Sequence, residues 1–122
     1  MKKVTGNKVE KNETFDLEKN SISIRADFFL MQEINNYIDS LILKGKFDYS
    51  NQSDFIRKAI RAYKDGMELD YAPQTGKKKA MSLIVEEDLF LFYQELPKGN
   101  KASIIERCLG TFLKNENKKS LV

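Results

Sequence analysis

The order of apolar and polar residues predicts a short strand followed by two helices in the first half of the chain. Residues 21–26 alternate between polar and apolar side chains, which is typical of a half-buried strand. Apolar residues then recur at helical spacing over about 28–44, and Asn51 is placed to cap a second helix, with Asp54 three residues later. The apolar positions of these elements are Ile22, Ile24 and Ala26, then Leu30, Ile34, Tyr37, Ile38 and Leu41, then Phe55, Ile56, Ala59, Ile60 and Tyr63.

The second half of the chain repeats this order. Residues 81–85 alternate again, a short apolar helix is expected from about Glu87 to Leu96, and Asn100 is placed to cap a last helix. The apolar positions of the last helix follow those of the earlier one at a separation of 49 residues, and the two strands match at 59 residues. Strand, helix and helix therefore occur twice. The matching positions in the last helix are Ile104, Ile105, Cys108, Leu109 and Phe112.

The repeat divides the chain into two small units joined by a linker. We expect a flexible tail over 1–20, a first unit over 21–66, a linker over 67–79, a second unit over 80–115 and a C-terminal tail over 116–122. Units of this size bury too little surface to be stable separately, so they are expected to share one core. The pattern leaves open whether the two strands pair within one chain or like strands from two chains form separate ribbons.

Two segments of the first unit resemble a known family. They are Ser-Ile-Ser-Ile-Arg-Ala-Asp from Ser21 and Asn-Gln-Ser-Asp-Phe-Ile-Arg-Lys-Ala-Ile-Arg from Asn51, with an apolar helix and a turn containing Gly45 between them. This order resembles the ribbon-helix-helix DNA-binding family of the Arc/MetJ type, and the turn and second helix are similar to those of ParD-type antitoxins. The second unit is similar mainly in order and apolar pattern, since Ala102 and Glu106 stand where the family usually has Ser and Arg.

The resemblance implies a fold that is mainly α with a two-stranded antiparallel β-ribbon, formed by two tandem units as an intramolecular pseudo-dimer. This layout is similar to that of tandem proteins of bacterial conjugation. The resemblance also implies sequence-specific binding of double-stranded DNA, with the ribbon in the major groove. The outward side chains would read the bases, and they are Ser21, Ser23 and Arg25 from the first strand and Ala80, Ser82 and Ile84 from the second. A solvent-facing strand edge without DNA contact is the alternative for the same residues.

The two strands carry different outward residues, so an asymmetric target site is expected. Arg25 is suited to bidentate bonding with guanine, the serine hydroxyls both donate and accept, and Ile84 or Ala80 is suited to a thymine methyl group. Arg25 corresponds to Ile84 in the repeat. A directional rather than a palindromic site follows from this difference.

Contacts to DNA phosphate are expected where each unit's second helix begins, because main-chain N–H groups point outward there with partial positive charge. A run of three lysines before the second strand is a further candidate clamp, with a solvated linker as the alternative. Arg57 and Arg61 are expected to stay solvated or to pair with acidic neighbours, and Cys108 to be a small buried residue. The candidate phosphate-binding residues are Asn51, Gln52, Ser53, Asn100, Lys101 and Ala102, with Lys77, Lys78 and Lys79.

Composition argues against several classes of function. The chain of 122 residues has no histidine and one cysteine, which argues against histidine-dependent catalysis, most zinc sites and an internal disulfide. Its glycines do not form a phosphate-binding loop. We therefore expect no enzyme activity, no metal and no cofactor. Without an apolar run long enough to span a membrane, a cytoplasmic location and no membrane partner are expected. The formal net charge of +3 suits a polyanionic partner without requiring one.

The sequence is compatible with three functions. The leading one is a transcriptional regulator or a relaxosome accessory factor of a plasmid, a phage or another mobile element, with a relaxase or a second copy on DNA as further partners. The second is an antitoxin whose tail, over 1–20 or after Lys114, folds on a toxin. The third is an enzyme subunit that uses Glu86, Glu87 and Asp88, although these lie at an expected exposed helix start.

Overall fold

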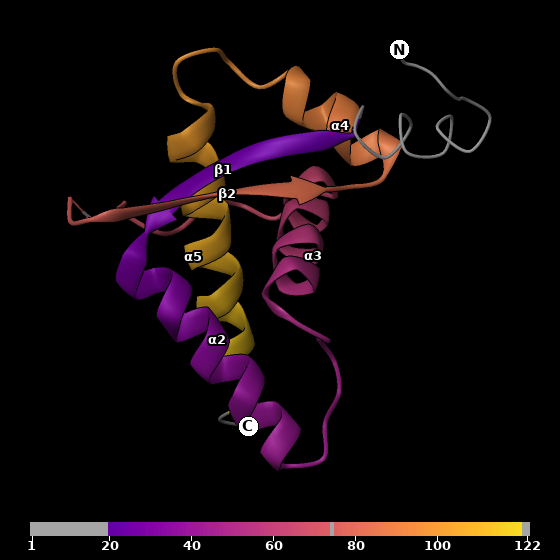
Figure 1. Ribbon diagram of the computed structural model, residues 1–122, viewed down its shortest axis with the longest axis vertical. Helices are drawn as coiled ribbons and strands as arrows, with labels where there is room; N and C mark the ends of the chain where they lie inside the picture. The colour runs from indigo at the N-terminus through magenta and orange to yellow at the C-terminus, as the bar shows by residue number, and fades with distance from the viewer. Residues whose placement is uncertain (1–19, 74, 121–122) are drawn as a thin grey trace, which may run out of the picture.

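The computed structural model describes residues 20–73 and 75–120 of the chain, without the side chain of the last of these (Figure 1). These residues form a two-stranded antiparallel sheet and four helices, and most of them are helical. The expectation of a mainly α fold with a two-stranded antiparallel ribbon is confirmed. The elements are β1 (Ser21–Asp27), α2 (Phe28–Leu43), α3 (Gln52–Lys64), β2 (Lys78–Ile84), α4 (Glu87–Gln94) and α5 (Lys101–Ser120).

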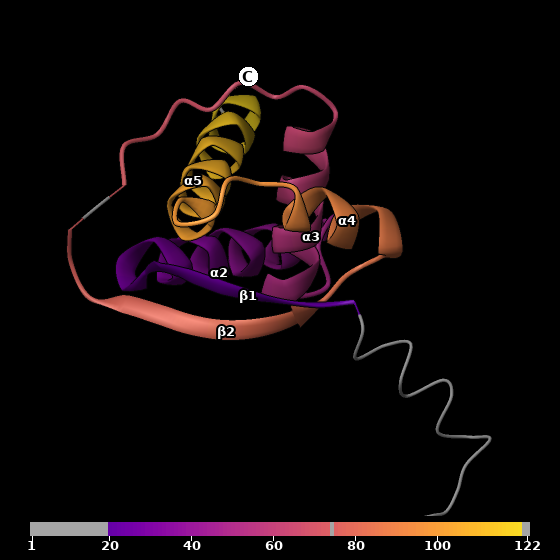
Figure 2. The ribbon, with the colours of Figure 1, turned by 90° about the horizontal axis from the view of Figure 1, so that it is seen from above.

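The ribbon pairs β1 with β2 of the same chain. Ile22 lies opposite Leu83 and Ile24 lies opposite Met81, so the apolar alternation of both strands falls on one face. That face is covered by the helices, as Figure 2 shows, where the ribbon runs along one side of the molecule. The other face carries the polar residues of the alternation.

One continuous hydrophobic core joins the ribbon and all four helices. Phe55 on α3 lies at its centre with no exposed surface. Its ring centroid is 5.0 Å from that of Tyr49 and 5.1 Å from that of Phe112 on α5. Because these three rings come from both halves of the chain, the halves share their core, as expected for units too small to be stable alone.

Two elements extend into segments for which no regular structure was expected. β2 begins at Lys78, inside the expected linker, and α5 continues to Ser120, through most of the expected tail over 116–122. Glu116 explains the longer helix, because its buried carboxylate accepts hydrogen bonds from the hydroxyls of Tyr49 at 2.7 Å and Tyr37 at 3.3 Å. Residues 1–19 of the expected N-terminal tail lie outside the described residues.

The connection between α3 and β2 packs against α5. The main-chain N–H of Asp70 donates to the Thr111 hydroxyl at 2.7 Å, and the Lys114 ammonium lies 3.1 Å from the Asp70 carboxylate. Beside them, the Tyr71 ring lies so close to Gly110 that a Cβ atom there would be 2.2 Å from the ring. The helix therefore needs glycine at this position because of the close approach of the ring, and not because of its backbone angles.

Gly110→Ala is expected to destabilise the protein by about 1–3 kcal/mol, the usual cost of overpacking a well-packed contact. In a Tyr71→Ala background the same change is expected to stabilise it by up to about 1 kcal/mol, because alanine is the better helix former. Urea unfolding of the four proteins of this cycle measures both effects. An equal effect of Gly110→Ala in both backgrounds would contradict the packing described above.

Candidate nucleic-acid interface

The six side chains expected to read DNA bases all lie on the outward face of the ribbon, and all six are exposed. The apolar Ile84 is 42% exposed, so it is available for contact with a ligand. The helices leave this face open (Figure 2). The six residues form three cross-strand pairs, Ser21 with Ile84, Ser23 with Ser82, and Arg25 with Ala80.

Equivalent residues of the two repeats meet at two places. Ser23 and Ser82 form the middle one of the three outward pairs, and they are 59 residues apart, the separation at which the strands repeat. Behind the ribbon, the Cys108 thiol donates to the Ala59 carbonyl at 3.1 Å, and these residues are 49 residues apart, the separation at which the helices repeat. One pair of equivalent residues is therefore in contact in the ribbon, and another between α3 and α5.

The start of α3 is capped as expected. The Asn51 side chain accepts a hydrogen bond from the Asp54 N–H at 2.9 Å. The Asp54 carboxylate accepts from the N–H of Ser50 at 3.1 Å, one residue before the position of a standard capping box. Burial alone would raise the pKa of Asp54, but the Ser50 N–H and the Lys58 ammonium lower it below its ordinary value.

The neighbouring polar residue at the start of α3 is used inside the protein. The Gln52 amide donates to the Met31 carbonyl of α2 at 3.1 Å, which fixes α3 against α2. Its side chain is therefore not a candidate for contact with phosphate, although its main-chain N–H still is. Ser53 is half-buried beside it.

The start of α5 contacts residues at the end of α4, and one of these residues is bonded to the ribbon. The Lys101 ammonium donates to the Gln94 carbonyl at 3.0 Å and lies 4.8 Å from the centre of the Tyr93 ring. The Tyr93 hydroxyl in turn donates to the Ser23 carbonyl of β1 at 2.8 Å. Within the described residues the Asn100 side chain makes no capping hydrogen bond, although its carbonyl accepts from Ile104 as the first turn begins.

A groove of about 680 Å³ lies between the outward face of the ribbon and the start of α5. Three cationic side chains and no carboxylate are among its lining residues. Lys98 and Tyr93 were not among the expected site residues, because only the turn before α5 and the packing of α4 bring them to the ribbon. The lining residues are Ser23, Ile24, Arg25, Ala80, Met81, Ser82, Tyr93, Lys98, Gly99, Lys101 and Ala102.

The three consecutive lysines, Lys77, Lys78 and Lys79, differ in their surroundings. The Lys78 ammonium lies 2.9 and 3.1 Å from the carboxylate oxygens of Glu106 on α5, which is only 3% exposed and also accepts from the Asp27 N–H at 3.3 Å. A buried carboxylate needs such a partner, so Lys78 serves the fold and is withdrawn from the candidate phosphate clamp. Lys77 and Lys79 are exposed and remain candidates.

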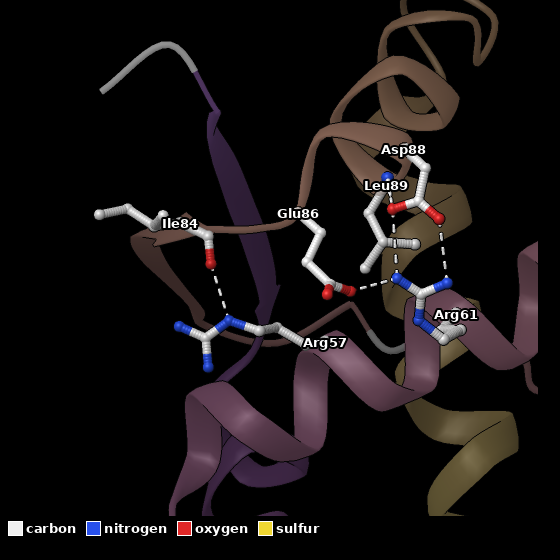
Figure 3. Close-up of polar contacts among 6 residues, drawn as sticks. All are labelled: Arg57, Arg61, Ile84, Glu86, Asp88 and Leu89. Carbon is white, nitrogen blue, oxygen red and sulfur yellow. Dashed lines mark hydrogen bonds and ion pairs between the residues drawn. The ribbon is translucent and has the colours of Figure 1, made fainter. Parts of the chain in front are cut away.

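Two arginines of α3 reach the end of β2 and the start of α4 (Figure 3). Arg61 pairs with Asp88 at 3.0 Å and with Glu86, as expected for a helix arginine beside acidic neighbours. Its hydrogen bonds hold the pKa of Asp88 below the ordinary value. Arg57 instead donates its Nε–H to the Ile84 carbonyl at 2.7 Å, so it anchors the end of the ribbon.

Cys108 is buried between α3 and α5, which confirms its expected role as a small interior residue. Burial raises the pKa of its thiol to about 12. Since the thiolate is the reactive form, we expect no labelling by a thiol reagent at pH 8 in the folded protein and rapid labelling in urea. The raised pKa also predicts that stability falls as the pH rises from about 9, where an unfolded thiol ionises, towards 12. Rapid labelling of the folded protein would contradict the burial of this thiol.

Comparison of the chain with protein-family models, with curated proteins and with solved structures finds no match. No helix of the described segments is long and apolar enough to cross a membrane. In the same segments, no group of three or more histidine, cysteine, aspartate or glutamate side chains is placed to hold a metal ion. The candidate interface therefore rests on the residues of this chain and on their geometry.

Proposed function

We propose that this chain is a sequence-specific, double-stranded DNA-binding protein of the ribbon-helix-helix type, in which one chain supplies both strands of the reading ribbon. The observation that carries this proposal is the outward face of the ribbon, where six exposed side chains form three cross-strand pairs. Such binding would serve the regulation of transcription or, as an accessory role, plasmid conjugation at a relaxosome.

The chemistry of the outward face suits the edges of base pairs. The major groove of B-DNA is about 12 Å wide and admits a two-stranded ribbon. Ser23 and Ser82 present hydroxyls that donate and accept, and Arg25 presents a planar fork of donors that matches guanine. Arg25 has no hydrogen-bond or ion-pair partner within the described segments, so its guanidinium is available for a base.

Two contacts between equivalent residues support the pseudo-dimer. In an assembly with two-fold symmetry, a residue meets its own counterpart only at the axis. Ser23 pairs with Ser82 in the ribbon, and Cys108 bonds to Ala59 behind it. An approximate two-fold axis that passes through both contacts accounts for them together. It would also place the first turns of α3 and α5 on opposite sides of the ribbon, where the two DNA backbones would run.

The outward residues give this interface a direction. The approximate axis relates Arg25 to Ile84 and Ser21 to Ala80, so each half presents different chemistry to its half of the DNA site. One half carries a guanidinium for guanine, and the other carries an apolar side chain for a thymine methyl group. We therefore propose that the target site is asymmetric and that the protein binds it in one orientation.

Selection of duplexes from a random-sequence pool tests the proposal. We expect one non-palindromic sequence to be enriched and to bind at least about 1,000-fold more tightly than unselected DNA. The variant Ser23→Ala/Ser82→Ala is expected to weaken binding of the selected duplex, and Lys64→Ala, at the far end of α3, is expected to leave it unchanged. Failure to bind any duplex even at low salt would refute the proposed function.

A further inference from the structure

The groove beside β1 is cationic on both walls. Arg25 stands on the ribbon wall, and Lys98 and Lys101 stand on the wall formed by the turn before α5 and its first residues. Lys98 has no ion-pair partner within the described residues, and Lys101 contacts a carbonyl and a ring but no carboxylate. Among the described residues no acidic side chain lines the groove, so none of them neutralises its positive charge there.

The equivalent positions on the other side of the ribbon lack these cations. The helix repeat of 49 residues relates Lys98 to Tyr49, which is 6% exposed and donates its hydroxyl to Glu116. The same repeat relates Lys101 to Gln52, whose amide is bonded to α2. The two lysines on the β1 side thus correspond to a buried tyrosine and to a glutamine whose amide is already hydrogen-bonded on the β2 side.

On the β2 side, the Nε–H of Arg57 is already bonded to the ribbon. Its counterpart in the repeat is Glu106, buried with Lys78 at the opposite end of the ribbon. Helices α3 and α5 therefore anchor the ribbon through residues of opposite charge. Arg57 of α3 donates to a carbonyl of β2, and Glu106 of α5 accepts from the Asp27 N–H of β1. The halves of the molecule differ in their electrostatics as well as in their outward residues.

We infer that the two halves hold the DNA backbone by different means, and this inference rests on the proposed function. The DNA strand beside β1 lies in the cationic groove, where Lys98 and Lys101 neutralise its phosphates. The strand beside β2 is held mainly by the main-chain N–H groups at the start of α3. The backbone contacts therefore reinforce the orientation that the base-reading residues set.

Tyr93 acts as a positioning residue in this arrangement. Its hydroxyl donates a hydrogen bond to the Ser23 carbonyl on β1, and its ring makes a cation–π contact with the Lys101 ammonium. It thereby fixes the distance between the ribbon wall and the α5 wall of the groove. A Tyr93→Phe variant keeps the ring beneath Lys101 and loses only the bond to β1, so it is the conservative way to loosen the groove.

The test compares Lys98→Ala/Lys101→Ala with the matched control Lys64→Ala/Lys118→Ala, which removes the same charge. Lys64 is the last residue of α3 and Lys118 lies in the last turn of α5, and Figure 2 shows that both helices run away from the ribbon. Each phosphate contact contributes about 0.9 to the slope of log K against log salt. We expect the groove variant to reduce that slope by about 2 on the selected duplex, and the control to leave it unchanged.

Phosphate ethylation interference locates the contacts. With the wild-type protein, interference is expected in both halves of the selected duplex, and with the groove variant it is expected to disappear in one half only. Equal loss in both halves, or a slope reduced equally by the control, would overturn the unequal-halves inference while leaving the proposed function standing. A selection that yields no specific duplex would overturn both.

Discussion

Arg25→Ala is expected to weaken binding of the selected duplex by about 5- to 150-fold, equivalent to about 1–3 kcal/mol, and to leave binding of unselected DNA nearly unchanged. The reason is that Arg25 stands exposed and unpaired on the outward face, opposite the small Ala80, so its guanidinium has room to reach a guanine edge. Fluorescence anisotropy with the selected duplex and a scrambled duplex of the same length measures both quantities.

A second variant separates base reading from simple attraction by charge. Arg25→Lys keeps the positive charge but loses the planar fork, so it is expected to bind unselected DNA as the wild type does and the selected duplex more weakly. The base at the position read by Arg25 should become less restricted in a new selection with the alanine variant. An equal loss of affinity for both duplexes would show that Arg25 contacts phosphate instead of a base.

Phe55→Ala is expected to reduce the free energy of unfolding by about 3–5 kcal/mol, the usual range for a fully buried phenylalanine. Phe55 has no exposed surface and packs against rings from both halves of the chain. Since small domains are stable by only about 5–15 kcal/mol, this one substitution removes a large share of the total. Urea unfolding followed by circular dichroism measures the change.

The control for this prediction is Leu43→Ala at the end of α2, where the side chain is 88% exposed. It is expected to change the free energy of unfolding by no more than about 0.5 kcal/mol. Both variants should unfold in a single transition, and labelling of Cys108 on α5 should follow the same curve. Two separate transitions in Phe55→Ala, with α5 still protected, would contradict the shared core.

The alternation and helical spacing of the sequence were sufficient for the order of the elements and for the outward face of the ribbon. These features are local: the side chains of a strand alternate between its faces, and a helix buries one stripe. The six outward positions followed from the alternation alone. Asn51 was likewise identified as a cap because its partner, the Asp54 N–H, is only three residues away.

The features that the sequence did not reveal depend on contacts between distant segments. The three lysines are equivalent in the sequence, but Lys78 binds Glu106, which lies 28 residues later. The extension of α5 depends on Glu116 and hydroxyls far earlier in the chain. No local pattern distinguishes a lysine that meets a buried carboxylate from one that meets solvent, because the difference arises only when the helices pack.

The composition of the groove beside β1 has the same origin. Lys98 lies in a short turn with no periodic signal, and Tyr93 reads as one more aromatic residue of a short apolar helix. The repeat offers one usable signal, since an alignment at 49 residues places Lys98 against Tyr49 and Lys101 against Gln52. Such a comparison finds the difference between the halves, but only the fold shows that the difference lies beside the ribbon.

The most direct test of the central claim is the mass of the complex with the selected duplex, measured by native mass spectrometry at low protein concentration. If one chain supplies the whole ribbon, the smallest specific complex contains one chain of 14.1 kDa and one duplex. A minimal site that is palindromic and bound only by two chains, with like strands paired between them, would contradict the account.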